Sequence, residues 1–484
     1  MDYRKEYEKW LASPALSEDE RAELRALEGN DKEIKARFYG PLEFGTAGLR
    51  GTMYTGLHNM NRHVIRWATQ GFANVIRAEG TEAMQKGVAV CMDCRNHSAE
   101  FARETACVMA ANGIHVRLFE SLRPTPELSF AVREYGCQAG VNVTASHNPA
   151  IYNGIKVFTA GGRDADQVVT GKIEEQIALL KPEDVKSIDY DQAMEMGLIR
   201  EGYPFNEYID SILQVVDTKK IKRAHLRIAI DPMYGVSQSS LRTILLTCRC
   251  DVDVIHEQHD TLFGGKMPAP SADTLKLLSN YVVDNGCNLG VATDGDADRL
   301  GVIDEKGAFL HPNTLLVLLY YYLVKYRGWS GPCVRNNSTT HLLDRVAKDM
   351  GQQCYEVPVG FKYISAKMAE TNAVIGGESS GGLAVRGHIA GKDGIYAAAL
   401  LVEMLAVTGK SVSQLYQEIT DKYGMLYYED AAFTMTQARK VELQEKLFVK
   451  LEVPDFGNAV EKINRTDGCK VYFTDGSWVI CRFS

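Results

Sequence analysis

Two short polar turns carry residue types that could transfer a phosphoryl group. Ser146 and His147 are adjacent in TASHNP (144–149), directly after the apolar strand pattern of residues 139–143. A serine oxygen can accept and release phosphate when nearby cations offset the charge. The segment lacks the glycines of a G-x-S-x-G hydrolase elbow, which disfavours acyl transfer. The alternative is a serine that only caps a turn, since Ser, Asn and Pro are common turn formers.

Three aspartates alternate in DGDADR (294–299), again directly after an apolar strand pattern. Asp294, Asp296 and Asp298 would repel one another, and a divalent cation would neutralise them. A ligand set made only of oxygens suits Mg²⁺. An EF-hand is disfavoured: Glu305 stands at the twelfth position, but Arg299 occupies the position that needs glycine. A solvated acidic turn without metal is the remaining alternative.

The elements that must position these turns follow a β–α–β rhythm. Short apolar strands alternate with amphipathic helices in residues 87–145, and the rhythm recurs at 226–293 and 331–377. It predicts mainly parallel sheets with helices on both faces. Each block leads into an unusual polar turn after a strand: TASHNP, the Asp-rich DGDADR and the Gly-rich GGESSGG. Because ligands of open α/β sheets bind at the carboxyl ends of strands, we expect the three turns to meet at one cleft.

The ends of the chain have patterns of their own. SEDERAELRALEG (17–29) predicts a helix capped by Ser17 with Glu20 and stopped at Gly29. After residue 422 the pattern predicts a strand, a helix and a hairpin. The start, MDYRKEYEKWL, lacks the apolar core of a signal peptide, and no run is long enough to span a bilayer, so a cytoplasmic protein is expected.

Composition narrows the classes of function. A length of 484 residues predicts two to four domains, and a net charge of -8 disfavours a nucleic-acid partner, which needs a basic surface. Eleven cysteines, an odd number in a chain without a secretion signal, fit reduced thiols. Cys91 and Cys94 have CxxC spacing, but Cys91 continues an apolar strand, which favours packing over a redox role.

Five motifs together resemble a known family. They are GTAGLRG (45–51), TASHNP (144–149), DGDADR (294–299), GGESSGG (376–382) and HIAGKDG (388–394). In order and spacing, over nearly the whole chain, they resemble the α-D-phosphohexomutase superfamily, and within it the phosphoglucomutase/phosphomannomutase branch.

The resemblance implies an α/β fold. Three similar mixed α/β sandwich domains and a smaller C-terminal α+β domain would surround a central cleft. The expected bounds are 1–205 for the first domain, with an N-terminal helical extension and the phosphoserine loop, and 206–307 for the domain with the metal loop. The domain with the sugar-recognition loop is expected at 308–421, and a partial fourth domain at 422–484.

The resemblance also assigns roles to residues. Ser146 would be carried as phosphoserine, and together with Asp294, Asp296 and Asp298 it would hold one Mg²⁺ per active site, completed by a phosphate oxygen. The other residues implied in catalysis are Arg50 and Arg299 near the transferring phosphate, Lys156 for proton transfer, and His147 beside the phosphoserine.

Substrate binding is implied for a further set. Glu378 and Ser380 fall where the family's sugar loop grips ring hydroxyls. His388 and Lys392 match a positively charged loop of the glucose-type branch, and Gly360 is a fifth substrate-binding position.

The implied reaction interconverts hexose 1-phosphate and hexose 6-phosphate, with glucose favoured over mannose. It would pass through a hexose 1,6-bisphosphate that turns end over end in the cleft and also serves as primer. The expected partner is a small phosphosugar, with no nucleic acid or membrane, and the expected state is a monomer or weak homodimer.

The sequence departs from the family pattern in places. Ser379 stands where a second glutamate is usual, and Gly382 stands where one dual-specificity branch has histidine, which favours the glucose-type branch. The chain stops at CRFS, before the family's SGTEP-like phosphate loop. We therefore expect weak mutase activity from this chain, and turnover equal to that of a chain extended past Ser484 would contradict this.

Other functions remain open at this stage. One is phosphopentomutase activity, which the same branch includes. Another is a phosphatase of the haloacid-dehalogenase kind, with Asp294 as nucleophile, although this leaves Ser146 and the sugar loop without a role. The third is a sugar-phosphate binder without catalysis.

Overall fold

The computed structural model describes residues 2–45, 48–181 and 184–483. Thr46 and Ala47 of the GTAGLRG motif, and Ser484 at the end of CRFS, lie outside the described residues.

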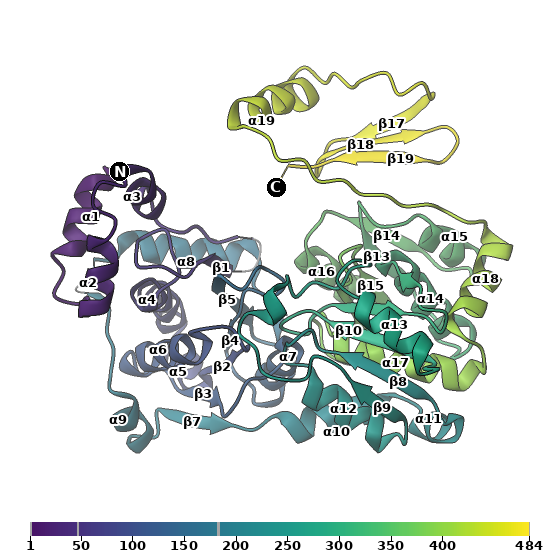
Figure 1. Cartoon of the computed structure of the whole chain (residues 1–484), viewed down its shortest axis with the longest axis horizontal. Helices are drawn as coiled ribbons and strands as arrows, with labels where there is room; N and C mark the ends of the chain where they lie inside the picture. The colour runs from purple at the N-terminus through teal and green to yellow at the C-terminus, as the bar shows by residue number, and fades with distance from the viewer. Residues whose placement is uncertain (1, 46–47, 182–183, 484) are drawn as a thin grey trace.

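Three sheets with one common strand order form the body of the molecule (Figure 1). Their shared strands are β2 (Val88–Met92), β3 (Val116–Phe119), β4 (Ala139–Val143), β5 (Tyr152–Thr159), β8 (Arg227–Asp231), β9 (Asp251–Val254), β10 (Leu289–Thr293), β11 (Leu300–Ile303), β13 (Cys333–Asn336), β14 (Cys354–Val357), β15 (Ile375–Gly377) and β16 (Leu383–Val385). The orders are β3-β2-β4-β5, β9-β8-β10-β11 and β14-β13-β15-β16.

Within each sheet the first three strands are parallel and the fourth is antiparallel to its neighbour. The turn into that antiparallel strand carries the motif in every case: TASHNP lies between β4 and β5, DGDADR between β10 and β11, and ESSGG between β15 and β16. The recurring sequence rhythm is therefore a structural repeat, and the sheets are mixed.

The first sheet is extended by strands and helices of its own. β1 (Gly48–Thr52) pairs antiparallel with β5, the short β6 (Arg163–Asp164) also pairs with β5, and β7 (Ile199–Gly202) joins β3.

Ser17 and Glu20 form the predicted capping box, but the helix ends at Arg25, before Gly29. The helices of this region are α1 (Tyr3–Leu11), α2 (Glu18–Arg25), α3 (Asp31–Phe38), α4 (Arg62–Ala78), α5 (Thr81–Lys86), α6 (Ser98–Ala111), α7 (Thr125–Glu134), α8 (Gln167–Leu179) and α9 (Tyr190–Glu195).

The second and third sheets share one hydrophobic core. It includes residues from Phe130 to Ile419. At its centre is α17 (Gly394–Thr408), a helix rich in Ala, Leu and Val that is buried on nearly all sides and packs against helices and strands of both sheets. The other helices here are α10 (Phe205–Val215), α11 (Thr218–Ala224), α12 (Gln238–Thr247), α13 (Lys276–Asp284), α14 (Pro312–Lys325), α15 (Leu342–Asp349), α16 (Phe361–Thr371) and α18 (Val412–Tyr423), with the 3-10 turn η2 (Phe263–Gly265) and the short β12 (Phe309–Leu310).

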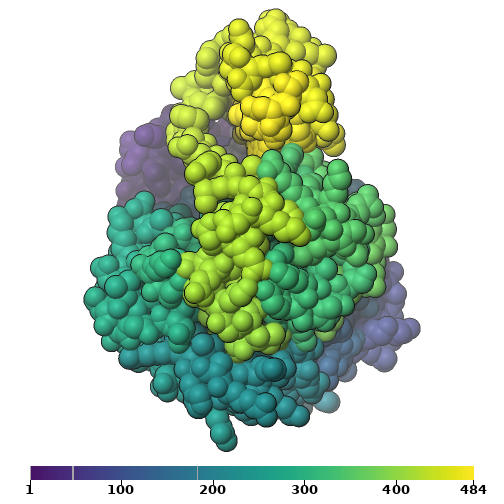
Figure 2. Space-filling view, turned by 90° about the vertical axis from the view of Figure 1, so that its right-hand side faces the viewer, coloured from purple at the N-terminus to yellow at the C-terminus, as the bar shows by residue number. Residues whose placement is uncertain are grey.

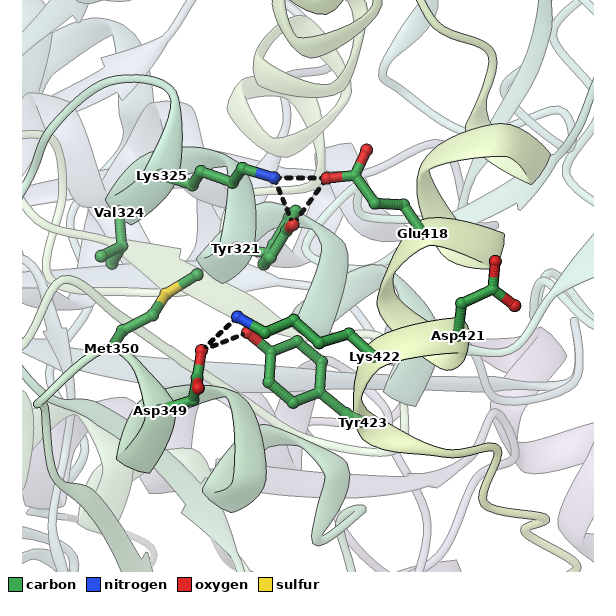
Figure 3. A pocket seen from close by; sticks show the side chains of 9 residues that line it. All are labelled: Tyr321, Val324, Lys325, Asp349, Met350, Glu418, Asp421, Lys422 and Tyr423. Carbon is green, nitrogen blue, oxygen red and sulfur yellow. Dashed lines mark hydrogen bonds and ion pairs between the residues drawn. The ribbon is translucent and has the colours of Figure 1, made fainter.

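Helix α18 and residues of α14 and α15 line a cavity of about 760 Å³, and polar contacts at this cavity hold α18 to the other two helices (Figure 3). Glu418 of α18 accepts hydrogen bonds from Lys325 and from the Tyr321 hydroxyl of α14, the latter at 2.6 Å. Lys422 Nζ and the Tyr423 hydroxyl lie 2.6 and 2.8 Å from Asp349 Oδ2, at the end of α15. Because these side chains satisfy one another, they hold the helix from which the chain leaves toward its C-terminal part.

The C-terminal part is a small lobe, yellow at the top of Figure 2, joined to the body by a narrow connection. Residues 424–436 form neither helix nor strand and are mostly exposed, so the strand predicted after 422 was wrong. An isolated strand has no neighbour to satisfy its backbone groups. The predicted helix is α19 (Gln437–Gln444), continued by a π-helical turn, η3 (Glu445–Val449). The hairpin is part of a three-stranded sheet of β17 (Val460–Asn464), β18 (Cys469–Phe473) and β19 (Trp478–Cys481).

The lobe docks on the third domain through several polar contacts, among which Lys470 is buried; Asp467 and Tyr472 also bond to this domain. Lys470 of β18 donates hydrogen bonds to the Asn337 carbonyl at 2.6 Å and to Glu356 of β14 at 2.9 Å. Its ammonium also lies 4.4 Å from the centre of the Trp478 ring. Burial lowers the pKa of Lys470 to about 8.

Among the described residues, no single helix is both long and apolar enough to cross a bilayer; only α17 and α18 taken together reach that length, and they are bent by 79°.

Gly48 tests the pairing of β1 with β5. A Cβ at this position would lie 1.9 Å from the Ile155 carbonyl oxygen, whereas one at Gly40 would meet nothing within 4 Å. We expect Gly48→Ala to destabilise the first domain by about 1–3 kcal/mol, because the strands must move apart. Thermal unfolding followed by circular dichroism measures this, with Gly40→Ala as the matched control. Equal melting temperatures for the two variants would contradict the close approach.

Candidate active site

A cavity of about 530 Å³ is lined by residues of all three domains, including the DGDADR turn at Arg299 and the ESSGG turn. The Ser146 turn, Lys156 and the three aspartates are not among its described lining residues and adjoin it through Arg299. Of the residues singled out in the sequence, seven line it: Arg50, Arg299, Gly360, Glu378, Ser379, Ser380 and Lys392. Asp164, Asn336, Lys362 and Arg482 also line it. Five cationic side chains and three carboxylates, those of Glu43, Asp164 and Glu378, therefore line the wall, and this excess of cations suits a phosphorylated ligand.

Ser146 lies on the turn after β4 with its side chain buried. Its backbone has φ 52°, a left-handed conformation that is uncommon outside glycine. Its Oγ is 3.0 Å from Asp294 Oδ2 and 3.3 Å from His147 Nδ1. The turn thus holds the hydroxyl against the aspartate cluster of the second domain, as the convergence of the turns predicted.

The Ser146 turn is held by the buried side chain of Arg95. Its guanidinium donates hydrogen bonds to four carbonyl oxygens of this turn, those of Ser146, Asn148, Pro149 and Tyr152, at 2.7, 2.7, 2.9 and 3.0 Å. Asp93 lies 3.2 Å from Arg95 Nε. One rigid planar group therefore fixes the backbone on both sides of the hydroxyl.

The three aspartates are fully buried, and one carboxylate oxygen from each lies within 4.8 Å of the others. Burial and the neighbouring carboxylates raise the pKa of Asp294 well above its usual range. For Asp296 and Asp298 burial acts in the same direction, but Lys156 lowers the pKa of both carboxyls, and Lys392 further lowers that of Asp298. Three buried carboxyl groups this close together are stable only when cations offset their negative charge.

The donor set of this cluster fits a divalent cation. Asp296 Oδ1 and Asp298 Oδ1 are buried and have no hydrogen-bond partner. Unpaired buried carboxylate oxygens are costly, and hard cations such as Mg²⁺ prefer such oxygens. The backbone of the aspartate turn also lies close to that of the Ser146 turn. A Cβ on Gly295 would lie 2.9 Å from the Ser146 carbonyl oxygen, so a glycine at this position lets the two turns meet.

Two lysines from different domains face the aspartates. Lys156 of β5 contacts Asp296 Oδ2 and lies 2.8 Å from Asp298 Oδ2; Lys392 of the third domain lies 2.7 Å from that same oxygen. Burial alone would lower the pKa of Lys156, but the two carboxylates raise it. Lys156 therefore carries a proton at neutral pH.

The remaining residues predicted for catalysis also gather here. Arg50 Nη1 donates to Asn148 Oδ1 at 3.1 Å on the serine turn, and Arg299 Nε lies 3.9 and 3.8 Å from Asp294 and Asp298. Burial, together with the charges of Arg299 and Arg50, lowers the pKa of His147 to about 3. His147 is therefore a neutral imidazole beside the hydroxyl.

The ESSGG turn forms the opposite wall. Glu378 Oε1 accepts hydrogen bonds from the Gly360 N–H at 3.3 Å and from Asn336 Nδ2 at 3.4 Å, and the Ser380 hydroxyl lies 3.4 Å from Glu378 Oε2. These contacts are long, so the carboxylate and hydroxyl retain capacity to bind a ligand.

His388 does not line this cavity. Its side chain is buried, and its Nε2 lies 2.9 Å from Asp393, while its carbonyl accepts a hydrogen bond from Arg133 at 2.6 Å. The structure places it as a support of the loop that carries Lys392. The physical reason is that Asp393 caps α17 and draws the imidazole away from the cleft.

Cys91 and Cys94 are buried thiols whose pKa values burial raises. No disulfide joins them. The two cysteines are therefore packed in the interior, which is the interpretation that the sequence favoured over a redox role.

Sequence reasoning missed several residues of the site. Thr125 donates to Asp296 Oδ2 at 2.7 Å, and Arg95 holds the serine turn. Thr125 follows β3 and Arg95 follows β2, which are parallel to β4 in the order β4-β2-β3, so the rule on carboxyl ends of strands could have indicated them. Asp164 and Arg482 had no local signal, because Asp164 sits in a short hairpin and Arg482 comes from the C-terminal lobe.

Comparisons with known proteins agree with this geometry. Family models described as "Phosphoglucomutase/phosphomannomutase, alpha/beta/alpha domain" I, II and III match residues 41–183, 206–307 and 311–423. A protein of Thermococcus kodakarensis named phosphoglucomutase/phosphomannomutase is 30% identical over 441 residues, which are 91% of each chain. A protein of Methanobrevibacter smithii named probable phosphoglucosamine mutase is 28% identical over 440 residues, again 91% of each chain.

A solved structure shares the fold. The crystal structure of a putative phosphomannomutase from Thermus thermophilus has a TM-score of 0.79 and 28% identity, and the match covers 92% of this chain and 93% of that one. Since family models cover more than half of the chain and relatives match it along most of their length, the chain belongs to the phosphoglucomutase/phosphomannomutase family of the α-D-phosphohexomutase superfamily, a family of intramolecular phosphotransferases.

Proposed function

We propose that the protein interconverts hexose 1-phosphate and hexose 6-phosphate, with glucose as the favoured hexose, through a phosphorylated Ser146. The observation that carries this proposal is the 3.0 Å contact of Ser146 Oγ with the buried aspartate cluster, beside a cavity lined by cations.

The chemistry is a transfer of one phosphoryl group in each direction. A sugar hydroxyl oxygen bonds to phosphorus while the bond between phosphorus and Ser146 Oγ breaks, which gives a hexose 1,6-bisphosphate. After the bisphosphate turns over, Ser146 Oγ bonds to the other phosphorus, and the sugar oxygen leaves. The hydroxyl proton lost in the first step is regained by the leaving sugar oxygen in the second.

The chain's own residues hold charge and protons during these steps. Arg50 and Arg299 lie beside the serine turn and offset the charge of the phosphate, which is about −1.5 to −2 on a phosphoserine. Lys156, which the two carboxylates keep protonated, would offset negative charge on the phosphate and is the proposed group for proton transfer. His147 Nδ1, 3.3 Å from Ser146 Oγ, would hold a hydrogen bond to that oxygen. Mg²⁺, held by Asp294, Asp296, Asp298 and an oxygen on Ser146, would act as a Lewis acid on the phosphate.

The sugar would be held by Glu378 and Ser380. A carboxylate and a hydroxyl can bind equivalent ring hydroxyls in either orientation of a bisphosphate. Arg482 and Lys362 line the same cavity and would hold the phosphate that does not react.

An amino sugar is a second candidate substrate. Relatives that match most of the chain are named probable phosphoglucosamine mutase, and the Glu378 carboxylate could pair with a sugar ammonium. An assay of the 1-phosphates of glucose, mannose, glucosamine, ribose and deoxyribose, side by side, decides between them. The highest kcat/KM on glucosamine or a pentose would overturn the choice of glucose.

Phosphorylation of Ser146 is the direct test of the proposal. After incubation with glucose 1,6-bisphosphate and Mg²⁺, we expect phosphate on Ser146 by peptide mapping, and we expect Ser146→Ala to lower kcat at least about a thousandfold, because the acceptor oxygen is gone. Ser380→Ala is the matched control, since a serine of the same cavity should leave the phosphorylation in place. Phosphate found on Asp294 would instead support a phosphatase of the haloacid-dehalogenase kind.

The aspartate cluster predicts a dependence on metal. We expect chelation to abolish activity and Asp298→Asn to raise the Mg²⁺ concentration for half-maximal activity more than about tenfold, because one of three charged ligands is lost. Asp284→Asn, on the exposed end of α13, serves as control. Full activity of the chelated protein would argue against a metal site here.

Arg95 is a positioning residue for Ser146. A lysine cannot donate to four carbonyl oxygens in one plane, so we expect Arg95→Lys to lower kcat by about 10–100-fold and to change KM by less than about threefold. Arg117→Lys, a surface arginine stacked on Tyr135, is the control. A parallel loss of thermal stability without a selective effect on kcat would show that Arg95 serves the fold alone.

A further inference from the structure

A third cavity, of about 510 Å³, lies between the first and third domains. Its walls come from α7, the turn between β5 and β6, α16, and the loop of residues 386–390. Among the described residues, no lining residue of this cavity also lines the catalytic one. The size is that of a site for a small metabolite.

This cavity is strongly basic. Arg133, Arg163 and Arg386 line it, and no Asp or Glu occurs among its described lining residues. The chain as a whole has a net charge of -8, so the local excess of positive charge does not reflect the composition. Three guanidinium groups without acidic neighbours in one cavity form a site for an anion with more than one charged group.

The arginines keep hydrogen-bond donors for a ligand. Arg133 uses Nη1 on the His388 carbonyl, and Arg386 uses Nη1 on the carbonyls of Ser330 and Asn372. The exposed side chain of Arg163 has no hydrogen bond or ion pair to any other described residue. Each guanidinium has five N–H donors, so most of them remain available.

The rest of the lining suits a short carbon skeleton. Met368, Ala369 and Val385 offer apolar surface, and Thr159 offers a hydroxyl. Small residues and one flexible thioether leave room beside the cations for a few carbon atoms.

The cavity adjoins the loop that enters the active site. The Arg133 guanidinium donates to the His388 carbonyl at 2.6 Å, and Ser365 Oγ donates to the Ala390 carbonyl at 2.7 Å. Two residues further on, Lys392 lies 2.7 Å from Asp298. A ligand bound to Arg133 would therefore touch the group that supports this loop from behind.

We propose that this cavity is an accessory site for a small phosphorylated molecule that carries a second anionic group, such as a carboxylate or another phosphate. The proposal goes beyond the mutase function and does not rest on it, because it concerns binding at residues outside the catalytic cavity. A phosphate would pair with two arginines, and the second anionic group with the third.

Calorimetric titration with 3-phosphoglycerate tests the proposal. The titration is done on the full chain with Ser146→Ala, in saturating glucose 1-phosphate, so that the catalytic cavity is occupied and no transfer occurs. We expect one equivalent of 3-phosphoglycerate to bind, more tightly than inorganic phosphate or glycerate, and more weakly as salt is raised.

Variants of Arg163 locate the binding. Arg163→Glu should raise the Kd at least about tenfold, since a charge-assisted hydrogen bond is replaced by repulsion. Arg163→Lys keeps the charge and should raise the Kd less. The matched control is Arg200→Glu, on the exposed edge strand β7.

Two results would overturn the proposal. One is an absence of 3-phosphoglycerate binding at millimolar concentration, and the other is a Kd that Arg163→Glu leaves unchanged. Failure of the mutase function would show separately, as a lack of phosphate on Ser146, and would leave the dependence on Arg163 intact.

Discussion

The balance of buried charge at Asp294, Asp296 and Asp298 is the constraint on which the rest of the structure depends. Carboxylates removed from water are costly unless cations compensate them. Here the aspartates belong to the second domain, Lys156 comes from the first and Lys392 from the third. The charges are therefore balanced only when the three domains are assembled, which ties the chemistry of the site to the arrangement of the domains.

The repeated strand order makes this assembly feasible. In each domain the turn between the third, parallel strand and the fourth, antiparallel strand carries a group of the site. The turns of the second and third domains contribute to the lining of the shared cavity, and the turn of the first meets that of the second through Ser146 and Asp294. One topological position thus supplies the serine, the aspartates and the sugar loop in turn. The turns approach closely because Gly295 lets the backbone of one contact that of another, and because Arg95 holds the Ser146 turn in its left-handed conformation.

Two cations at the edge of the site depend on contacts between residues far apart in the chain. Arg482 reaches the cavity from the C-terminal sheet, which docks through Lys470 on β14. The loop with Lys392 is supported from the far side by Arg133 of the first domain. Arg482 comes from a region without a catalytic motif, and the motif loop with Lys392 depends on Arg133, which lies outside the motifs, so the electrostatics of the site extend beyond the motifs.

The sequence by itself determined the local parts of this protein. Alternation of strands and helices predicted the α/β domains, and the turns with Ser146 and the three aspartates were evident because their polar residues are consecutive or alternate. Their meeting at one place followed from the rule for strand ends. The strand-end rule could have indicated Arg95 and Thr125, but tertiary structure alone decided what they contact, brought Arg482 to the cavity, and turned His388 toward Asp393. It also left residues 424–436 without the strand that their pattern suggested. The reason is physical, since hydrogen bonds, burial and ion pairs between residues far apart in the chain exist only after the domains have packed, and no local pattern encodes them.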